Sequence, residues 1–542
     1  MKKDEQYDVV VIGGGHNGLV CSAYLARQGL KVCVVEKRAV VGGAALTEEF
    51  APGFRNSVYS YAVSLLNPRV IAELELHRHG LKLIPLSVNG WKRFSPMADG
   101  GFLALSADPE QSALALDARS KGDGAAFKEL NRRLALAADV LRSLVLETPP
   151  NLQGDFGSIV RALSTGSKLR KLDMQGRAEL VKLMTMSVGD YLNTLFNDDA
   201  IKGLYGYSAA VGNMQSPYSA GSAYVLLHHV FGELNGKKGQ WGQAIGGMGA
   251  ITQAIASSAG ELGVKMVTGK GVTEVLLEQD RAVGVRLDDG QVIRAASVVS
   301  NLNPRLLFTK LVDRAAQPED FHRRMETWRC ISGVFRMNVA LSELPDFTCA
   351  PGNDPASYRA ASVVIAPSLQ YLEQAYDDAK HGAYSKEPII ELQIPSIQDS
   401  TLAPPGQHVA SMFCQYFHPH QSDGRSWDDI KDEIADHIIG HYTKFAPNFR
   451  RAIVARQIKS PLDIERDLGM IGGDIFHGAL HLDQLFSMRP APGYADYRTP
   501  IKKLYNCGSG THPGGGVTGA PGRNAAFEVA RDFKSGFRKL FH

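Results

Sequence analysis

The apolar positions of residues 7–36 fall into a strand–helix–strand pattern. Residues 7–12 and 31–36 are short, almost continuous apolar runs, as expected of parallel strands that are buried on both faces. Between them, residues 19–29 carry mostly small or apolar side chains and end at a glycine, which predicts a helix. This order predicts the start of a doubly wound α/β domain.

Residues 246–301 form a second unit of the same kind. A glycine-rich turn at 246–249 opens a helix that ends at Gly263, and apolar runs follow at 264–267, 272–277, 282–287 and 298–300. Residues 288–290, Asp-Asp-Gly, predict a hairpin turn after the run 282–287. The run 298–300 then returns to a buried strand.

The segments between and after these units differ in pattern. Residues 108–237 are largely helical, with helices expected near 125–145, 160–187 and 223–234 and breaks at 148–150 and at Gly176. Residues 308–480 mix strands, expected at 334–341, 362–365, 389–394 and 409–416, with a helix at 427–445. Polarity alternates along the first of these strands, around Arg336 and Asn338, which is typical of a sheet with one exposed face.

The composition describes a globular protein and excludes several classes. The chain has 542 residues, 44% hydrophobic and 21% charged, with a net charge of +3. Such balanced charge argues against a nucleic-acid partner, and no apolar run is long enough to span a membrane. The six cysteines form no C-x-x-C pair, so we expect neither a metal centre nor a redox dithiol. The N-terminus resembles no signal or transit peptide, so the expected location is the cytoplasm.

The turn after the first strand, GGGHNG, has the residues that a dinucleotide site requires. Gly13 allows a tight turn, Gly15 lets the backbone approach a pyrophosphate, and Gly18 allows the helix to pack closely on the strand. The helix N-terminus adds free N–H groups and a partial positive charge. The candidate cofactor-binding residues of this turn are Gly13, Gly14, Gly15, His16, Asn17 and Gly18, with His16 contacting the cofactor through its backbone.

The second strand ends at Glu36 and is followed by Lys37. A carboxylate at this point can accept hydrogen bonds from ribose hydroxyls, and it disfavours a 2′-phosphate, so FAD or NAD is expected rather than NADP. Gly42, Gly43 and Ala44 come next, where a glycine pair lets the backbone pass close to a bound nucleotide.

A second glycine-rich stretch lies near the C-terminus and leads into a helical pattern. So many glycines before a helix expose consecutive backbone N–H groups toward a ligand, and a helix N-terminus beneath a flavin would stabilise the negative charge of its reduced ring. The candidate residues here are Gly508, Gly510, Val517 and Gly519.

These features together resemble a known signature. The G-x-G-x-x-G turn, Glu36 and the Gly42–Gly43 pair resemble the extended FAD-binding signature of the flavin amine oxidase and carotenoid desaturase superfamily. The C-terminal GSGTHPGGGVTGAPGRNAA looks most like the phytoene dehydrogenase-related flavoproteins. The resemblance implies FAD, and Val272 would match the strand residue whose backbone faces adenine.

The same resemblance implies the domain organisation. We expect a Rossmann-type FAD-binding domain of the α/β class, built from three discontinuous segments, together with an α+β substrate domain and a helical insertion. The FAD-binding segments would be 1–107, 238–307 and 481–542. The insertion, a helical substrate- or membrane-facing part, would be 108–237, and the substrate domain 308–480.

The expected reaction is the dehydrogenation of a mostly apolar small molecule, carotenoid- or terpenoid-like or otherwise lipophilic. Hydride would pass to flavin N5, with oxygen or a quinone as the final acceptor. One alternative is oxidation of an amine or amino acid, which an aromatic cage with a carboxylate-pairing Arg would favour. Another is a flavoprotein that acts through partner binding or non-redox isomerisation. A single dinucleotide site without a cysteine pair favours a substrate-oxidising enzyme.

Three features leave alternatives open. His512, beside the second glycine-rich stretch, is the one candidate for acid–base catalysis, and its alternative is a hydrogen bond to loop backbone. The C-terminal helix places Phe527, Ala530, Phe533, Phe537, Leu540 and Phe541 on one stripe, fit either for a membrane surface or for packing on its own domain. The basic segment 161–182 is a solvated face or a peripheral membrane contact. The oligomeric state is left open.

Overall fold

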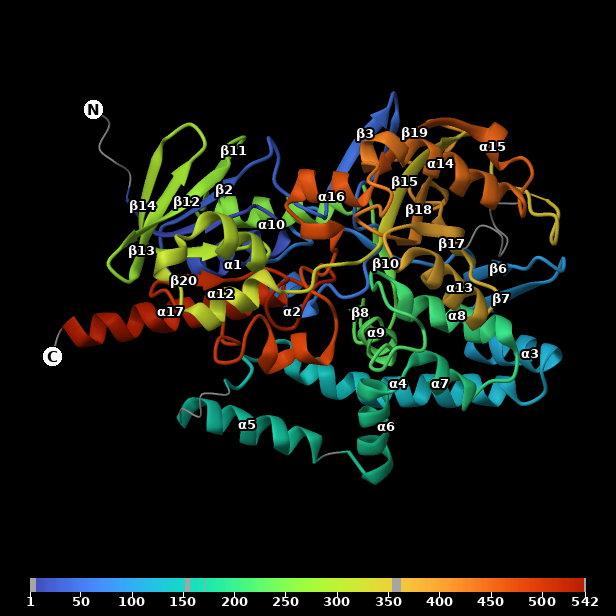
Figure 1. Ribbon diagram of the computed structural model, residues 1–542, viewed down its shortest axis with the longest axis horizontal. Helices are drawn as coiled ribbons and strands as arrows, with labels where there is room; N and C mark the ends of the chain where they lie inside the picture. Colours follow the sequence, from blue (N-terminus) through green and yellow to red (C-terminus); the bar gives the residue numbers. More distant parts are fainter. Residues whose placement is uncertain (1–5, 152–155, 171, 353–361, 541–542) are drawn as a thin grey trace.

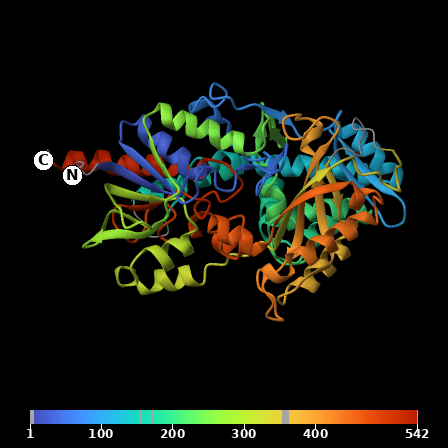
Figure 2. The ribbon, with the colours of Figure 1, turned by 90° about the horizontal axis from the view of Figure 1, so that it is seen from above.

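The computed structural model describes residues 6–151, 156–170, 172–352 and 362–540. Within these residues, two seven-stranded sheets lie at opposite ends of an elongated molecule, with the helical part beneath the second sheet in the view of Figure 1. The described chain enters the first sheet at its beginning, and its last helix lies beside the same sheet (Figures 1 and 2).

The first sheet has the parallel core that the sequence predicts. Its order is β11–β2–β1–β14–β13–β12, and β20 pairs with the end of β14. β1, β2, β11, β20 and the second half of β14 run parallel, whereas β12 and β13 form an antiparallel extension. The strands are β1 (Tyr7–Ile12), β2 (Val32–Glu36), β11 (Lys265–Thr268), β12 (Val272–Glu278), β13 (Arg281–Leu287), β14 (Val292–Ser300) and β20 (Leu504–Asn506).

Helices cover both faces of this sheet. One apolar cluster joins alternate residues of β1 and β2 to α1 (His16–Arg27), α10 (Gly249–Glu261) and α17 (Ala520–Leu540). The other face packs against α12 (Glu319–Glu326), and Figure 2 shows α10 and α12 on opposite sides. The prediction of a Rossmann-type α/β domain from discontinuous segments is therefore confirmed.

The second sheet is mainly antiparallel, in the order β19–β15–β18–β17–β16–β6–β7. Its strands are β6 (Trp91–Pro96), β7 (Phe102–Ser106), β15 (Val334–Leu341), β16 (Ser362–Ile365), β17 (Tyr384–Gln393), β18 (His408–Phe417) and β19 (Ile453–Lys459). The predicted strands of the substrate domain all lie within it. β6 and β7 precede residue 108, so the segment 1–107 contributes strands to both sheets.

The expectation of an exposed face on β15 is wrong, because all eight residues of that strand are buried. One face packs against α14 (Trp427–Thr443), and the other against α13 (Leu369–Ala379) and the cavity described below. Asn338 donates a hydrogen bond to the carbonyl of Ser57 at 2.9 Å. The polar positions of β15 therefore face the interior between the two domains rather than solvent.

The helical part agrees with the sequence in type but not in every boundary. The segment expected at 160–187 is two helices, because Asp173 caps the second one by accepting a hydrogen bond from the N–H of Gly176 at 2.7 Å. Gly176 thus lies inside a first turn and is not a break. The segment expected at 223–234 ends its helix at His228 and continues into β8 (Glu233–Leu234). The helices are α3 (Pro109–Arg119), α4 (Asp123–Val145), α5 (Phe156–Leu169), α6 (Met174–Thr185), α7 (Val188–Asn193), α8 (Asp199–Ala210) and α9 (Ala223–His228).

Short elements complete the fold. The strands are β3 (Thr47–Ala51), β4 (Phe54–Ser57), β5 (Leu83–Pro85), β9 (Lys237–Lys238) and β10 (Gly242–Ala244). The helices are α2 (Pro68–Glu73), α11 (Pro304–Leu306), α15 (Phe449–Ala452) and α16 (Pro461–Leu468).

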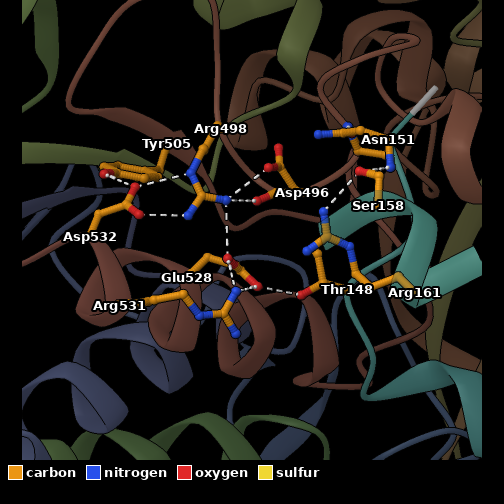
Figure 3. A network of polar contacts seen from close by, with 11 residues as sticks. Thr148, Asn151, Ser158, Arg161, Asp496, Arg498, Tyr505, Glu528, Arg531 and Asp532 are labelled. Carbon is orange, nitrogen blue, oxygen red and sulfur yellow. Dashed lines mark hydrogen bonds and ion pairs between the residues drawn. The ribbon is translucent and has the colours of Figure 1, made fainter. Parts of the chain in front are cut away.

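The C-terminal helix α17 packs on its own domain. Val529 and Ala530 are buried against the α1 side of the first sheet, whereas Phe527 is 42% exposed. Figure 3 shows Arg498 holding the helix through Asp532, at 2.7 Å, and Glu528, at 3.0 Å. This favours the packed alternative for the part described, and the side chains of Phe537, Leu540 and Phe541 lie outside it. Among the described residues, no helix has both the length and the apolar character needed to cross a membrane.

Candidate functional site

A cavity of about 510 Å³ lies between the two sheets. Residues from every predicted part of the cofactor site line it, namely Gly13, Gly15, His16, Glu36, Lys37, Gly43, Ala44, Val272 and Val517. The second sheet contributes the opposite wall, including Arg336 and Phe413. The two glycine-rich stretches, at the two ends of the chain, therefore border one space.

The two stretches also touch directly. The side-chain amide of Asn17 donates a hydrogen bond to the hydroxyl of Ser509 at 3.2 Å. Gly508 and Gly510 are tightly packed beside this contact, since a Cβ would lie 2.6 Å from the carbonyl oxygen of Asn301 and 2.2 Å from Pro304, respectively. The cavity is not lined by Gly508, Gly510 or Gly519. These glycines flank residues of the same stretch that do line it, such as Ser509 and Val517.

The turn at 13–18 has the geometry that its glycines predict. Gly13 has a φ of +93°, and a Cβ on Gly18 would lie 2.1 Å from the carbonyl oxygen of Gly13. Gly42 donates its N–H to the carbonyl of Gly14 at 2.9 Å. A Cβ on Gly43, whose φ is +56°, would lie 3.0 Å from the Cα of Gly15. Only glycines fit where these two backbones meet.

Glu36 lies at the edge of the cavity and is tied to the turn. Its carboxylate accepts hydrogen bonds from the backbone N–H of Gly14 at 2.7 Å and of Arg38 at 2.8 Å. The side chain is buried. A carboxylate has about four acceptor positions, so both oxygens keep capacity for further donors such as hydroxyls. Lys37 is exposed at the rim.

Two half-buried histidines, His16 and His477, line the cavity, and His477 was not singled out from the sequence. Burial lowers the pKa of His16 to about 4 and that of His477 to about 3, so both rings are neutral near pH 7. His16 Nε2 and His477 Nδ1 are buried without a hydrogen-bond partner. His477 lies in the GGDIFHG segment, and only its approach to the first turn in three dimensions relates it to the site.

His512 is not among the cavity-lining residues. Its Nε2 lies 3.0 Å from the carbonyl oxygen of Leu144, and its ring packs edge-on against Phe486. Burial lowers the pKa of the ring to about 4. These contacts favour the alternative of a backbone-bonded histidine and not the catalytic role.

The lining of the cavity is rich in aromatic rings and carries one buried cation. Its rings belong to Tyr59, Tyr61, Trp241, Phe413 and Phe476. Arg336, 2% exposed, lies over the Tyr61 ring with 4.7 Å from its Cζ to the ring centroid. The sequence pattern placed Arg336 on an exposed face, so this residue was missed.

Two cysteines meet in the fold although no motif joins them. The thiols of Cys21, on α1, and Cys507, after β20, interact in the apolar core of the first domain. Burial, with Cys21 beside it, raises the pKa of the Cys507 thiol well above its usual range. A thiol in this state is a poor nucleophile, so the pair does not have the environment of a redox dithiol. The described residues hold no cluster of three or more metal-ligating side chains.

Comparison with known proteins agrees with this architecture. Residues 11–73 match the family model of an NAD(P)-binding Rossmann-like domain. The chain is 42% identical to "Pyridine nucleotide-disulfide oxidoreductase domain-containing protein 2" of Mus musculus, over 98% of this chain and 94% of that protein. It is 27% identical to one of the limonene dehydrogenase subunits of Castellaniella defragrans, over 98% and 96%. It is 25% identical to a lycopene-forming phytoene desaturase of Paracoccus sp., over 62% and 63%.

A solved structure of putrescine oxidase with putrescine bound has the same fold. It matches with a TM-score of 0.59 and 15% identity, over 98% of this chain and 99% of that one. At this identity the likeness concerns the fold alone. The chain belongs to the family of pyridine nucleotide-disulfide oxidoreductase domain-containing protein 2, and its more distant relatives include a dehydrogenase subunit and a desaturase.

Proposed function

We propose that the protein is an FAD-dependent dehydrogenase of a mostly apolar small molecule, with oxygen or a quinone as the final electron acceptor. The observation that carries this proposal is the single cavity bordered by both glycine-rich stretches, by Glu36 and by Val272. Such a cavity suits an extended dinucleotide with phosphates at the first stretch and its redox ring near the last.

The residues present fit FAD. Gly15 and Gly43 let two backbone segments meet beside the cavity, because a Cβ would lie 2.8 Å from Asn301 Nδ2 at Gly15 and 3.0 Å from the Gly15 Cα at Gly43. The N-terminus of α1 would offer its free N–H groups to a pyrophosphate. Glu36 would accept hydrogen bonds from the ribose, and the unpartnered Nε2 of His16 is available to the phosphates or the ring. When bound, FAD supplies a hydride acceptor, while the protein supplies orientation and a dry environment.

The apolar part of the cavity supports the substrate class. Val211, Phe413, Ile475 and Phe476 line the space between the glycine cradle and the second sheet. Relatives named for limonene and phytoene are consistent with an apolar substrate.

A second candidate, an amine or amino acid oxidase, gains from one observation. Several aromatic rings and a buried guanidinium, that of Arg336, meet in the same wall, which is the arrangement expected for that alternative. The third alternative, partner binding or isomerisation without net redox turnover, is decided by the substrate experiment below.

The cofactor is tested by a matched pair of glycine variants. Gly43→Ala places a methyl group against Gly15, whereas Gly263→Ala imposes the same positive-φ strain, at +85°, in open space. We expect Gly263→Ala to be destabilised by about 1 kcal/mol and Gly43→Ala by more, because its methyl group also meets the Gly15 backbone. Only Gly43→Ala should lose its FAD, measured by absorbance and by the flavin released on denaturation. A wild-type protein purified without flavin and unable to bind it would refute the proposal.

The reaction is tested on wild-type protein by mixing it with lipophilic terpenoids, alkenes, amines and amino acids without oxygen. Bleaching of the flavin absorbance by a terpenoid or alkene supports the dehydrogenase, and bleaching by an amine or amino acid supports the second candidate. If no compound bleaches the flavin and a protein co-purifies, the third alternative is favoured.

A further inference from the structure

Arg336 is a buried cation whose hydrogen bonds go only to neutral groups. Its Nη1 donates to the carbonyl of Met412 at 3.1 Å and its Nη2 to the hydroxyl of Ser411 at 2.7 Å. Its Nε is buried without any partner. No ion pair within 4.0 Å joins it to a carboxylate of the described residues. Burial lowers its pKa to about 10, which leaves it charged at neutral pH.

The nearby carboxylate, that of Glu391, is already occupied. It is 1% exposed, and Arg93 approaches it at 3.7 Å. Four neutral side chains also donate to its two oxygens, namely Tyr61 and Tyr207 to Oε2, and Ser362 and Gln393 to Oε1. Arg336 makes no ion pair with Glu391 and lies over the ring of Tyr61, whose hydroxyl donates to that carboxylate. Two guanidinium groups therefore share one carboxylate, which leaves the wall with an excess positive charge.

The acidic residues that line the cavity, Glu36, Glu465 and Asp467, have partners of their own. Glu36 accepts from the N–H groups of Gly14 and Arg38, and Glu465 from that of Gly472 at 2.8 Å. Asp467 pairs with Lys459 and accepts from the hydroxyl of Tyr59, both at 2.6 Å. None of them contacts Arg336.

A buried charge without a counter-charge in direct contact is costly, and an anion that enters the cavity would relieve that cost. We propose that the substrate carries a carboxylate, which pairs with Arg336, on an apolar body that lies along Phe413, Phe476 and Val211. This inference rests on the proposed function and narrows its substrate class from a lipophilic molecule to an apolar carboxylic acid. A guanidinium suits this task because its planar fork matches a carboxylate.

The test measures binding by calorimetry to the protein as purified, so that it does not depend on turnover. The probes are two matched pairs, phenylpropionate with phenylpropanol and octanoate with octanol. We expect each acid to bind at least about tenfold more tightly than its alcohol. Equal affinity within both pairs, or no measurable binding of either acid, would overturn the proposal.

Three variants assign the preference to Arg336. Arg336→Met should weaken acid binding about 30-fold and leave alcohol binding nearly unchanged, and Arg336→Lys should be intermediate. Arg456→Met is the matched control, because it removes one positive charge from the neighbouring strand β19, where Arg456 pairs with Asp432 and Asp436. It should keep the full preference for acids.

The outcomes separate this inference from the proposed function. A wild-type protein that cannot bind flavin but still prefers acids through Arg336 would support the carboxylate site and refute the FAD enzyme. An Arg336→Met protein that loses FAD but keeps the acid preference would overturn the carboxylate site. If Arg336→Met does not fold, the proposal is tested by the ratio of acid to alcohol affinity in wild type and by whether that ratio falls in Arg336→Lys.

Discussion

Asn17 and Ser509, 492 positions apart in the sequence, are joined by a hydrogen bond of 3.2 Å between their side chains. Asn17 lies in the first turn of α1, and Ser509 follows β20. Both residues are buried. This contact fixes the first glycine-rich stretch to the last, so the two sides of the cavity are held together by the protein itself.

A double-mutant cycle on this pair measures the coupling. We expect Asn17→Ala and Ser509→Ala each to lower the free energy of unfolding of the apoprotein by about 1 kcal/mol, since each leaves the other partner unpaired. The double variant should cost less than the sum, by several tenths of a kcal/mol. Thermal and urea unfolding of the four proteins give these values, and strictly additive losses would show that the bond contributes nothing.

Glu36 offers a prediction about the cofactor. Glu36→Ala removes the acceptor for two backbone N–H groups and for the ribose, so FAD binding should weaken by about 1–3 kcal/mol. Glu36→Gln keeps one oxygen acceptor and should lose less. The measurement is a fluorescence titration of apoprotein with FAD, with Glu274→Gln, an exposed carboxylate on β12, as the control. If Glu36→Ala binds FAD as tightly as wild type, Glu36 does not bind the ribose.

The parts of the site that follow local rules could be predicted from the sequence. The turn at 13–18 and Glu36 stand in a strand–turn–helix–strand order, so the backbone geometry of each glycine follows from its neighbours. β15 and β16 likewise begin and end where their apolar runs do.

The parts that depend on distant contacts could not be predicted. Arg336 alternates with apolar residues, and that pattern describes a solvent-facing position as well as one that faces a buried cavity. The two cases differ only in whether another domain covers that face of the sheet. The meeting of Cys21 with Cys507, and the approach of His477 to the first turn, arise in the same way from packing between segments far apart in the chain.

Because His512 is buried and its pKa is lowered, we expect the stability of the protein to depend on pH. Its pKa is lowered from 6.5 to about 4 by burial, and next by the charge of Arg489, so between these values the unfolded chain binds a proton that the folded protein does not. The folded state therefore loses stability as the pH falls from 6.5 toward 4, by about 3 kcal/mol for this ring alone.

The measurement is the thermal unfolding midpoint across that pH range. His512→Gln should be less stable than wild type near pH 7 yet lose less on acidification, because it lacks the ring that titrates. His381→Gln, at an exposed position, should follow the wild-type curve. A His512→Gln curve parallel to that of wild type would show that burial of this ring does not set the slope.

Helices α5 and α6 lie at the outer side of the helical part in Figure 1 and expose apolar side chains among basic ones. Leu163 is 69% exposed, Met174 81% and Val181 61%. Within the same segment, Arg170, Arg177 and Lys182 are exposed. Apolar side chains beside basic ones favour an anionic lipid surface.

This surface predicts binding to anionic membranes. We expect the protein to sediment with vesicles of phosphatidylcholine and phosphatidylserine, less so with phosphatidylcholine alone, and to be released by salt, because the basic side chains supply part of the attraction. Leu163→Glu should reduce binding several-fold, whereas Leu114→Glu, at a position 72% exposed on α3, should not. If Leu163→Glu and Leu114→Glu bind the vesicles equally well, the apolar surface of α5 and α6 does not contact the membrane.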